Sequence, residues 1–349
     1  MDRHSDHKAR LAPFRAALYH GDAAAARGAL DALLTPDAPV RLSHPFGTAS
    51  GPAGFWDTAL APLIAAWPDL ERRDMIVVAG DTPEGADWVG ACGHYIGTFA
   101  RPWLDIPPTG HLAHIRYHEF FRFEDGRVTE VQALWDIPEV MMQAGAWPMA
   151  PQLGRAWAAP APATQDGLAP GPRDVAASAA SLRHVIDMLT HMGRHPAQGG
   201  PEVMQLDRFW HPRFGWYGPA GIGTARGVRG FRHWHQIPFL AAMPDRGQHP
   251  EGTQSHLFGD GAYVAVTGWP NMRQTLTGGG WLGLPPTGAQ LTLRSLDFWR
   301  LESGLIRENW VLVDLLDVFA QAGIDVLARM RELNKARMGF DPDTGKALT

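Results

Sequence analysis

Apolar residues along the chain follow two spacings, one typical of helices and one typical of strands. The helical spacing predicts helices at residues 5–34, 54–66, 174–192, 202–210 and 230–242. Runs rich in β-branched and aromatic residues predict strands at residues 75–79, 88–99, 111–123 and 128–135. Asp125-Gly126 is a hairpin signal between the last two runs. Helices therefore precede antiparallel strands, and a short helix closes the unit.

The chain repeats itself. Residues 103–145 align without a gap to residues 281–323, with 18 identities in 43 positions. Chance alone would give about two or three identities. A second block, 51–69 against 227–245, shares a Gly-x-x-Gly-Phe motif and a Pro-Asp pair. Each copy is about 150 residues long, which is the size of a domain.

The repeat predicts two domains of the same α+β fold, joined by a linker. An Ala/Pro/Gly stretch without periodic apolar residues separates the two copies. We expect copy one at residues 1–155, the linker at 156–173, copy two at 174–330 and a polar tail at 331–349. Each copy is expected to be a curved antiparallel sheet covered by N-terminal helices.

Composition excludes several classes of protein. The chain has 31 Lys+Arg against 36 Asp+Glu, a balance that does not favour a nucleic-acid or membrane-surface partner. Its single cysteine, Cys92, excludes a disulfide framework and a cysteine-based zinc site. The chain has no apolar run of membrane-spanning length, and its first residues do not resemble a secretory signal. We therefore expect a cytoplasmic protein.

Several motifs resemble one enzyme family. In copy one they are Gly-His-Tyr-Ile-Gly-Thr-Phe at 93–99, Pro-Pro-Thr-Gly at 107–110, Arg-Phe-Glu-Asp-Gly at 122–126 and Gln-Ala-Gly at 143–145. Copy two repeats the last three at 285–288, 300–304 and 321–323. In order and spacing, these motifs resemble the SnoaL-like polyketide cyclases. The resemblance implies the cone-shaped α+β fold of nuclear transport factor two-like domains.

The resemblance also implies a chemistry. Such cyclases close a ring by intramolecular aldol condensation of an apolar, carbonyl-bearing small molecule, without a metal or other cofactor. A pocket carboxylate exchanges the proton, helped by an apolar setting that raises its pKa. The family places this Asp three residues before the Asp that begins the closing helix. Those positions are Ala133 and Val311 here, so neither copy keeps the carboxylate.

The neighbouring strand offers other acids. The position of the family's pocket histidine falls on Glu119 in copy one and Asp297 in copy two. Because side chains alternate along a strand, Tyr117 and Phe121 share a face with Glu119, and Trp299 shares one with Asp297. An acid among aromatic residues is a candidate general acid/base. Glu119 and Asp297 are therefore the predicted catalytic residues, with the three aromatic residues as substrate contacts.

Two further positions resemble the strand that edges the family's pocket. They are His94 and Tyr95, one of which should point inward, and both are candidate substrate contacts. We expect copy one to hold the more enclosed pocket, with Glu119 as the more strongly perturbed acid. The alternative is that Glu119 pairs with an arginine, Arg72 or Arg116, or faces solvent.

The remaining histidines and two repeated aspartates have simpler interpretations. Strand geometry separates His111, His114 and His118, so we expect no metal site from this trio. Asp136 and Asp314 stand where a helix N-cap belongs, and each side chain is expected to accept from the backbone N–H three residues on.

Three hypotheses of function follow. The chain is a cyclase or isomerase, a non-catalytic protein that binds a hydrophobic ligand, or an enzyme in which one copy has degenerated into a support. In each case we expect the two sheets to pack face to face within the chain, as an intramolecular pseudo-dimer that covers their apolar faces.

Overall fold

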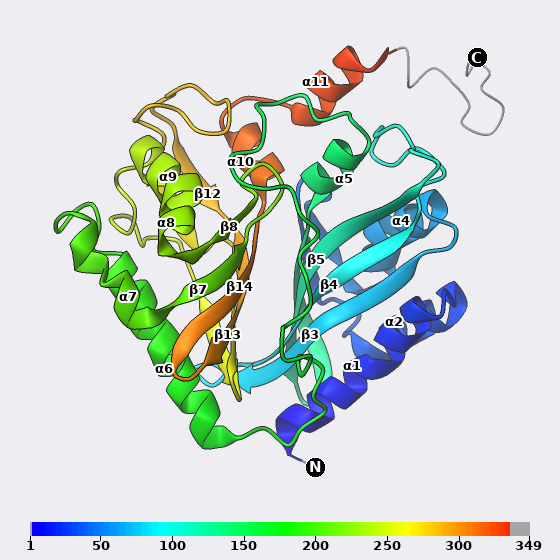
Figure 1. Ribbon diagram of the computed structural model, residues 1–349. Helices are drawn as coiled ribbons and strands as arrows, with labels where there is room; N and C mark the ends of the chain where they lie inside the picture. The colour runs from blue at the N-terminus through cyan, green and yellow to red at the C-terminus, as the bar shows by residue number, and fades with distance from the viewer. Residues whose placement is uncertain (1, 336–349) are drawn as a thin grey trace.

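The computed structural model describes residues 2–335 of the chain. Two six-stranded sheets face each other at the centre, and most of the helices lie on their outer sides (Figure 1). Of the predicted polar tail, residues 336–349 lie outside the described part. No helix among the described residues is long and apolar enough to span a membrane.

Copy one follows the predicted order of elements. Its helices are α1 (Arg3–Tyr19), α2 (Ala23–Leu33), α3 (Gly51–Phe55), the π-helical turn η1 (Trp56–Leu60), α4 (Ala61–Ala66) and α5 (Ile137–Gln143). Its strands are β1 (Pro39–Leu42), β2 (Thr48–Ser50), β3 (Glu71–Asp81), β4 (Asp87–Thr98), β5 (Leu112–Glu124) and β6 (Arg127–Trp135).

Copy two repeats this order, with shorter counterparts of β3, β4 and β5. Its helices are α6 (Val175–Met192), the 3₁₀ turn η2 (Pro201–Met204), α7 (Leu206–Phe209), α8 (Gly227–Phe231), the π-helical turn η3 (Arg232–Gln236), α9 (Ile237–Ala242), α10 (Leu315–Gln321) and α11 (Val326–Leu333). Its strands are β7 (Trp210–Tyr217), β8 (Thr224–Arg226), β9 (His256–Asp260), β10 (Tyr263–Thr267), β11 (Met272–Thr275), β12 (Gln290–Leu293), β13 (Ser295–Glu302) and β14 (Leu305–Val313).

The α+β class is confirmed, but the sheets are mixed rather than purely antiparallel. The strand order is β2-β1-β6-β5-β4-β3 in copy one and β8-β7-β14-β13-β10-β9 in copy two. The first strand of each copy pairs in parallel with the last, β1 with β6 and β7 with β14. These first strands carry little periodicity, which is why the sequence pattern did not predict them.

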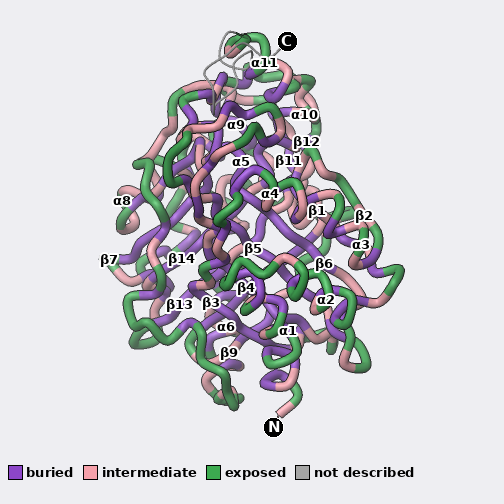
Figure 2. The backbone as a smooth tube through the Cα atoms, turned by 90° about the vertical axis from the view of Figure 1, so that its right-hand side faces the viewer, coloured by how far each residue is buried: buried purple, intermediate pink, exposed green. Residues whose placement is uncertain are grey.

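The face of each sheet turned away from its helices packs against the other copy. Phe120 and Phe298 contact each other across this interface, with ring centroids 5.1 Å apart and the planes tilted by 30°. His118 Nδ1 lies 2.6 Å from the carbonyl oxygen of Leu296. Buried residues run through the middle of the molecule (Figure 2). The two copies therefore share an apolar layer.

Two repeated aspartates connect the copies. Asp136 Oδ2 accepts a hydrogen bond from the backbone N–H of Ala220 in copy two, at 2.9 Å. Asp314 Oδ2 accepts one from the backbone N–H of His44 in copy one, also at 2.9 Å. The predicted N-cap is confirmed for Asp314, which accepts from the N–H of Asp317 at 3.3 Å, and is wrong for Asp136, whose side chain makes no cap hydrogen bond.

An arginine of copy one completes the connection. The guanidinium of Arg116 donates to the carbonyl oxygens of Tyr217, Gly218 and Val311, all in copy two. It also forms an ion pair with Asp136 at 3.5 Å. Since all these groups are buried, separating the copies would leave a charged guanidinium without its partners.

The linker, residues 156–173, has no helix or strand and lies against both sheets. The N–H of Val77 on β3 donates to the carbonyl oxygen of Gly167 at 2.7 Å. The indole of Trp310 on β14 donates to the carbonyl oxygen of Pro160 at 2.8 Å. The linker thus contacts the edge of one sheet and the inner face of the other.

Candidate functional site

The interior of copy two contains a cavity of about 350 Å³ between its sheet and its helices. Strands β13 and β14 form the floor, and α6, η3 and the loop at residues 244–255 form the walls. The residues used in the argument below are Trp210, His235, Arg246, Ser295, Asp297 and Trp299. A largely apolar hollow with a few polar groups is the usual form of a small-molecule site.

The cavity exists because large side chains of copy one are small in copy two. Tyr117 and Trp135 are cross-strand partners on β5 and β6. The corresponding pair on β13 and β14 is Ser295 and Val313. Replacing two aromatic side chains by a hydroxymethyl and an isopropyl group leaves space that nothing else fills.

A change of backbone enlarges the same space. In copy one β3 begins at Glu71 and carries Arg72 across the interior. The corresponding strand of copy two, β9, begins only at His256, and the segment before it is a loop. That loop contributes Arg246 to the cavity wall. The arginine of copy two therefore lies at the edge of a cavity, whereas Arg72 of copy one lies in the centre of a filled interior.

Asp297 is the acid of this cavity. It faces inward from β13 beside Ser295, whose hydroxyl donates to Asp297 Oδ1 at 2.8 Å. Burial raises the pKa of Asp297 from its ordinary value of 3.8 to about 7, although the Ser295 hydrogen bond and the charge of Arg246 act in the opposite sense. A carboxyl group of this kind can take up or release a proton near neutral pH.

A neutral imidazole lines another side of the same cavity. The ring of His235, on η3, stacks on Trp216 with centroids 4.3 Å apart. Burial lowers the pKa of His235 to about 3, so the ring is uncharged at pH 7. Its buried Nδ1 has no hydrogen-bond partner among the described residues.

Three indole N–H groups around the cavity also lack a partner among the described residues. They belong to Trp210, Trp281 and Trp299, each of which is buried. An unpaired buried donor costs about 1–3 kcal/mol, so such groups are expected to be satisfied by water or by a ligand. A ligand with several oxygen acceptors would meet this requirement.

The interior of copy one is different, and this corrects the expectation that it holds the more enclosed pocket. Glu119 is fully buried and accepts hydrogen bonds from Arg72 at 2.6 Å, from the hydroxyl of Tyr95 at 2.9 Å and from the indole of Trp135 at 3.0 Å. The Glu119 carboxylate therefore pairs with Arg72, which is one of the alternatives that the sequence left open. Arg72 also pairs with Asp74 at 3.0 Å, so charged and aromatic groups fill the space that is open in copy two.

The other predicted contacts divide between two faces of the sheet. Tyr95, Tyr117 and Phe121 lie in the interior of copy one, on the same side as Glu119. His94 lies on the opposite face of β4, so it does not share an interior with Tyr95. Trp299 lines the cavity of copy two beside Asp297, as predicted from strand alternation.

Sequence reasoning did not single out His235 or Arg246. Arg246 lies in a loop whose path no periodicity predicts, although a lone cation after the shared Pro-Asp pair could have drawn attention to it. Strand alternation puts Ser295 on the same face as Asp297, but its hydrogen bond to the acid is a structural finding.

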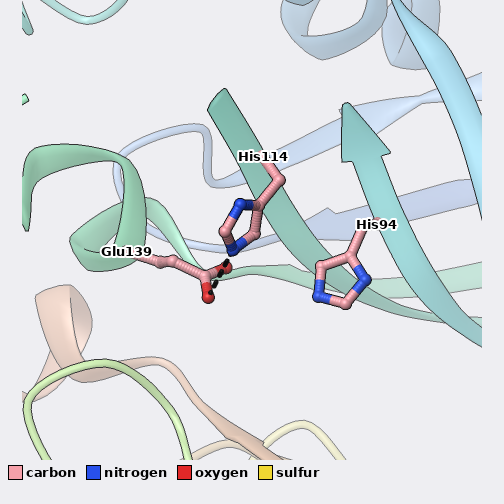
Figure 3. A group of neighbouring side chains, drawn as sticks. All are labelled: His94, His114 and Glu139. Carbon is pink, nitrogen blue, oxygen red and sulfur yellow. Dashed lines mark hydrogen bonds and ion pairs between the residues drawn. The ribbon is translucent and has the colours of Figure 1, made fainter. Parts of the chain in front are cut away.

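One group of side chains has the composition of a metal site. His94, His114 and Glu139 each offer a ligand atom, and these atoms all lie within 4.8 Å of one another (Figure 3). The group lies at the surface where copy one meets copy two, outside the cavity of Asp297.

Comparison with known proteins agrees with the duplicated architecture. The profile of the SnoaL-like polyketide cyclases matches residues 16–144 and again residues 200–322. No curated protein matches the chain in sequence.

Solved structures similar to this chain each align with about two fifths of it. IdmH of Streptomyces antibioticus, named as a candidate polyketide cyclase, is 22% identical over 40% of this chain and 98% of its own, with a TM-score of 0.34. A SnoaL-like protein of Jannaschia sp. CCS1 is 22% identical over 41% and 95%, with a TM-score of 0.33. An NTF2-like protein of Burkholderia thailandensis is 20% identical over 41% and 98%, with a TM-score of 0.31. Because the profile covers more than half of the chain, in two separate regions, the protein belongs to the SnoaL-like polyketide cyclase family and carries two copies of the family's domain.

Proposed function

We propose that copy two is the active domain and that it catalyses proton transfer on an apolar, carbonyl-bearing small molecule, as an aldol-type cyclase or an isomerase. The observation that carries this proposal is Asp297, an acid with a pKa of about 7 on the wall of an aromatic cavity. General acid/base catalysis works best when the pKa lies near the working pH.

The position of Asp297 compensates for the missing family carboxylate. Val311 stands where the family has its catalytic Asp, and Val311 is the cross-strand partner of Asp297. The side chains of such partners begin about 5 Å apart on the same face of a sheet. A carboxyl group on β13 can therefore reach the part of the cavity that one on β14 would serve.

The proposed reaction is an isomerisation that needs no cofactor. Ionised Asp297 removes a proton from the carbon next to a ligand carbonyl, and the resulting enolate attacks a second carbonyl of the same molecule. A carbon–carbon bond forms, and protonated Asp297 returns its proton to the new alkoxide. Ser295 orients the carboxyl group, and the unpaired indole N–H groups are available to the developing oxyanion.

Copy one is proposed to be the support. Its interior is filled, Glu119 is bound by Arg72, and the face of its sheet turned away from its helices packs against copy two. These contacts support the intramolecular pseudo-dimer expected from the sequence. The boundaries 1–155 and 174–330 and the cytoplasmic location stay predictions.

The test compares two variants by proton exchange. Wild-type protein is incubated in D₂O with a panel of aromatic ketones that bear acidic α-hydrogens, and deuterium uptake is measured by mass spectrometry. Asp297→Asn should lower the catalysed exchange by about 100-fold or more while ligand binding persists. Glu119→Gln, assayed at a temperature at which it is folded, should retain it.

The opposite pattern would defeat the proposal. Loss of exchange in Glu119→Gln with activity kept in Asp297→Asn would place the chemistry in copy one. Binding without exchange in the wild type would leave a ligand-binding protein.

A further inference from the structure

We propose that His94, His114 and Glu139 form a binding site for one divalent transition-metal ion of the zinc class, at the junction between the two copies. Two imidazoles and a carboxylate are a ligand set that such ions accept. His114 Nε2 and Glu139 Oε1 are already 3.2 Å apart, close to the separation of two ligands on one tetrahedral ion.

Three different elements supply the ligands. His94 is on β4 and His114 is on the adjacent strand β5, where the register places them diagonally on one face. Their ring centroids are 5.2 Å apart, with the planes at 84°. Glu139 approaches from the first turn of α5 (Figure 3). The separation in sequence explains why the spacing of His111, His114 and His118 gave no hint of the site.

The ligand atoms are available. His94 Nε2 is buried and has no hydrogen-bond partner among the described residues. It faces the space between His114 and Glu139 (Figure 3). Glu139 is fixed through its other oxygen, because the backbone N–H of Arg116 donates to Oε2 at 2.9 Å. Oε1 therefore stays directed toward the two histidines, and an ion would satisfy the orphan nitrogen.

The positive charge of the nearby Arg116 does not exclude a bound cation, because other groups already balance it. The guanidinium of Arg116 is occupied by three backbone carbonyl oxygens of copy two and by Asp136. Asp136 offsets its charge, so the carboxylate of Glu139 remains to balance part of the charge of an ion.

The site would have an open coordination position. A cavity of about 230 Å³ begins at His114 and Glu139. Trp157 of the linker and Ala220 and Thr224 of copy two close its other side. An ion held by three protein ligands could therefore take water or a small anion from this cleft, and it would fasten α5 to the sheet at the place where Asp136 contacts copy two.

The experiment is a titration of untagged, chelator-treated full-length protein with ZnCl₂ in a calorimeter. We expect one ion per chain, and a loss of affinity of at least about 10-fold in each of His94→Asn, His114→Asn and Glu139→Gln. The matched control is His111→Asn, a change at an exposed histidine just before β5, which should bind as the wild type does.

Two further readouts separate binding from folding. Circular dichroism verifies that each variant is folded. Zinc should raise the unfolding temperature of the wild type and of His111→Asn, and leave that of His94→Asn and His114→Asn unchanged, since only a folded site gains from binding. Absence of saturable binding, or binding that the three ligand variants keep, would overturn the proposal and leave a hydrogen-bonded His–Glu pair. Neither readout depends on turnover, so the result is independent of the function proposed for copy two.

Discussion

The ionisation of Asp297 predicts a specific dependence of stability on pH. In the unfolded chain this carboxyl group titrates near 3.8, whereas burial raises its pKa in the folded protein to about 7. Between these values the folded state holds a proton that the unfolded state has released. The contribution of this group to the free energy of unfolding is therefore fully present below about pH 4 and is lost as the pH rises through about 7.

The size of the effect follows from the shift. Three pKa units correspond to an upper limit of about 4 kcal/mol. Asp297 lines a cavity that is not fully closed to water, which lowers the cost of ionising its carboxyl group. We therefore expect a change of about 1–2 kcal/mol in the free energy of unfolding. In Asp297→Asn the amide stands in for the protonated acid, so this variant should be more stable than the wild type at pH 8.

The assay is the unfolding midpoint of both proteins from pH 3 to 8.5, in thermal and in denaturant unfolding. The advantage of Asp297→Asn should grow from nearly zero at the acid end and become constant above about pH 7.5. An advantage that does not change with pH, or a variant that is less stable throughout, would refute the assignment of Asp297 as a buried acid with a raised pKa.

Three other changes test the surrounding structure. Val313→Trp restores the bulk of its counterpart Trp135 and should abolish ligand binding with little loss of stability. Binding is measured by quenching of tryptophan fluorescence, and binding that persists in the variant would place the ligand elsewhere. Glu119→Gln removes the charged partner of buried Arg72 and should lower the free energy of unfolding at pH 7 by about 3–5 kcal/mol, which a denaturant titration measures. Asp136→Ala leaves the N–H of Ala220 and the guanidinium of Arg116 without a partner and should lower the free energy of unfolding by about 1–3 kcal/mol. The control Asp31→Ala, at an exposed position, should change it little, and equal effects of the two changes would argue against the contact between the copies.

Much of the fold could be predicted because it depends on local pattern. Alternation along β5 correctly placed Tyr117, Glu119 and Phe121 on one face, and the same alternation placed Asp297 beside Trp299. The hairpin at Asp125-Gly126 has the positive φ angles, 48° and 75°, that its turn requires. Gaps in the prediction fall on β1, β2 and β7; β1 and β2 are too short to carry a pattern, and β7 carries little periodicity.

The roles of the two acids could not be predicted, because they depend on residues distant in sequence. Glu119 and Asp297 occupy the same position in the repeat, yet one meets Arg72 and the other meets a cavity. The difference lies in the start of β3, which carries Arg72 and which copy two replaces by a loop. No spacing around either acid contains that information. A pair of aligned copies shows which side chains shrink, as at Ser295 and Val313, but not whether a backbone change adds to the space.

The central claim is that the ligand and the acid that acts on it meet in copy two. A crystal structure of the protein with an aromatic polyketone, soaked or co-purified, tests it most directly. We predict electron density between β13, α6 and η3, with a ligand oxygen within hydrogen-bonding distance of the Asp297 carboxyl group and the side chains around Glu119 unmoved. Density for the ligand beside Glu119 in copy one, with the cavity of copy two left empty, would contradict the account.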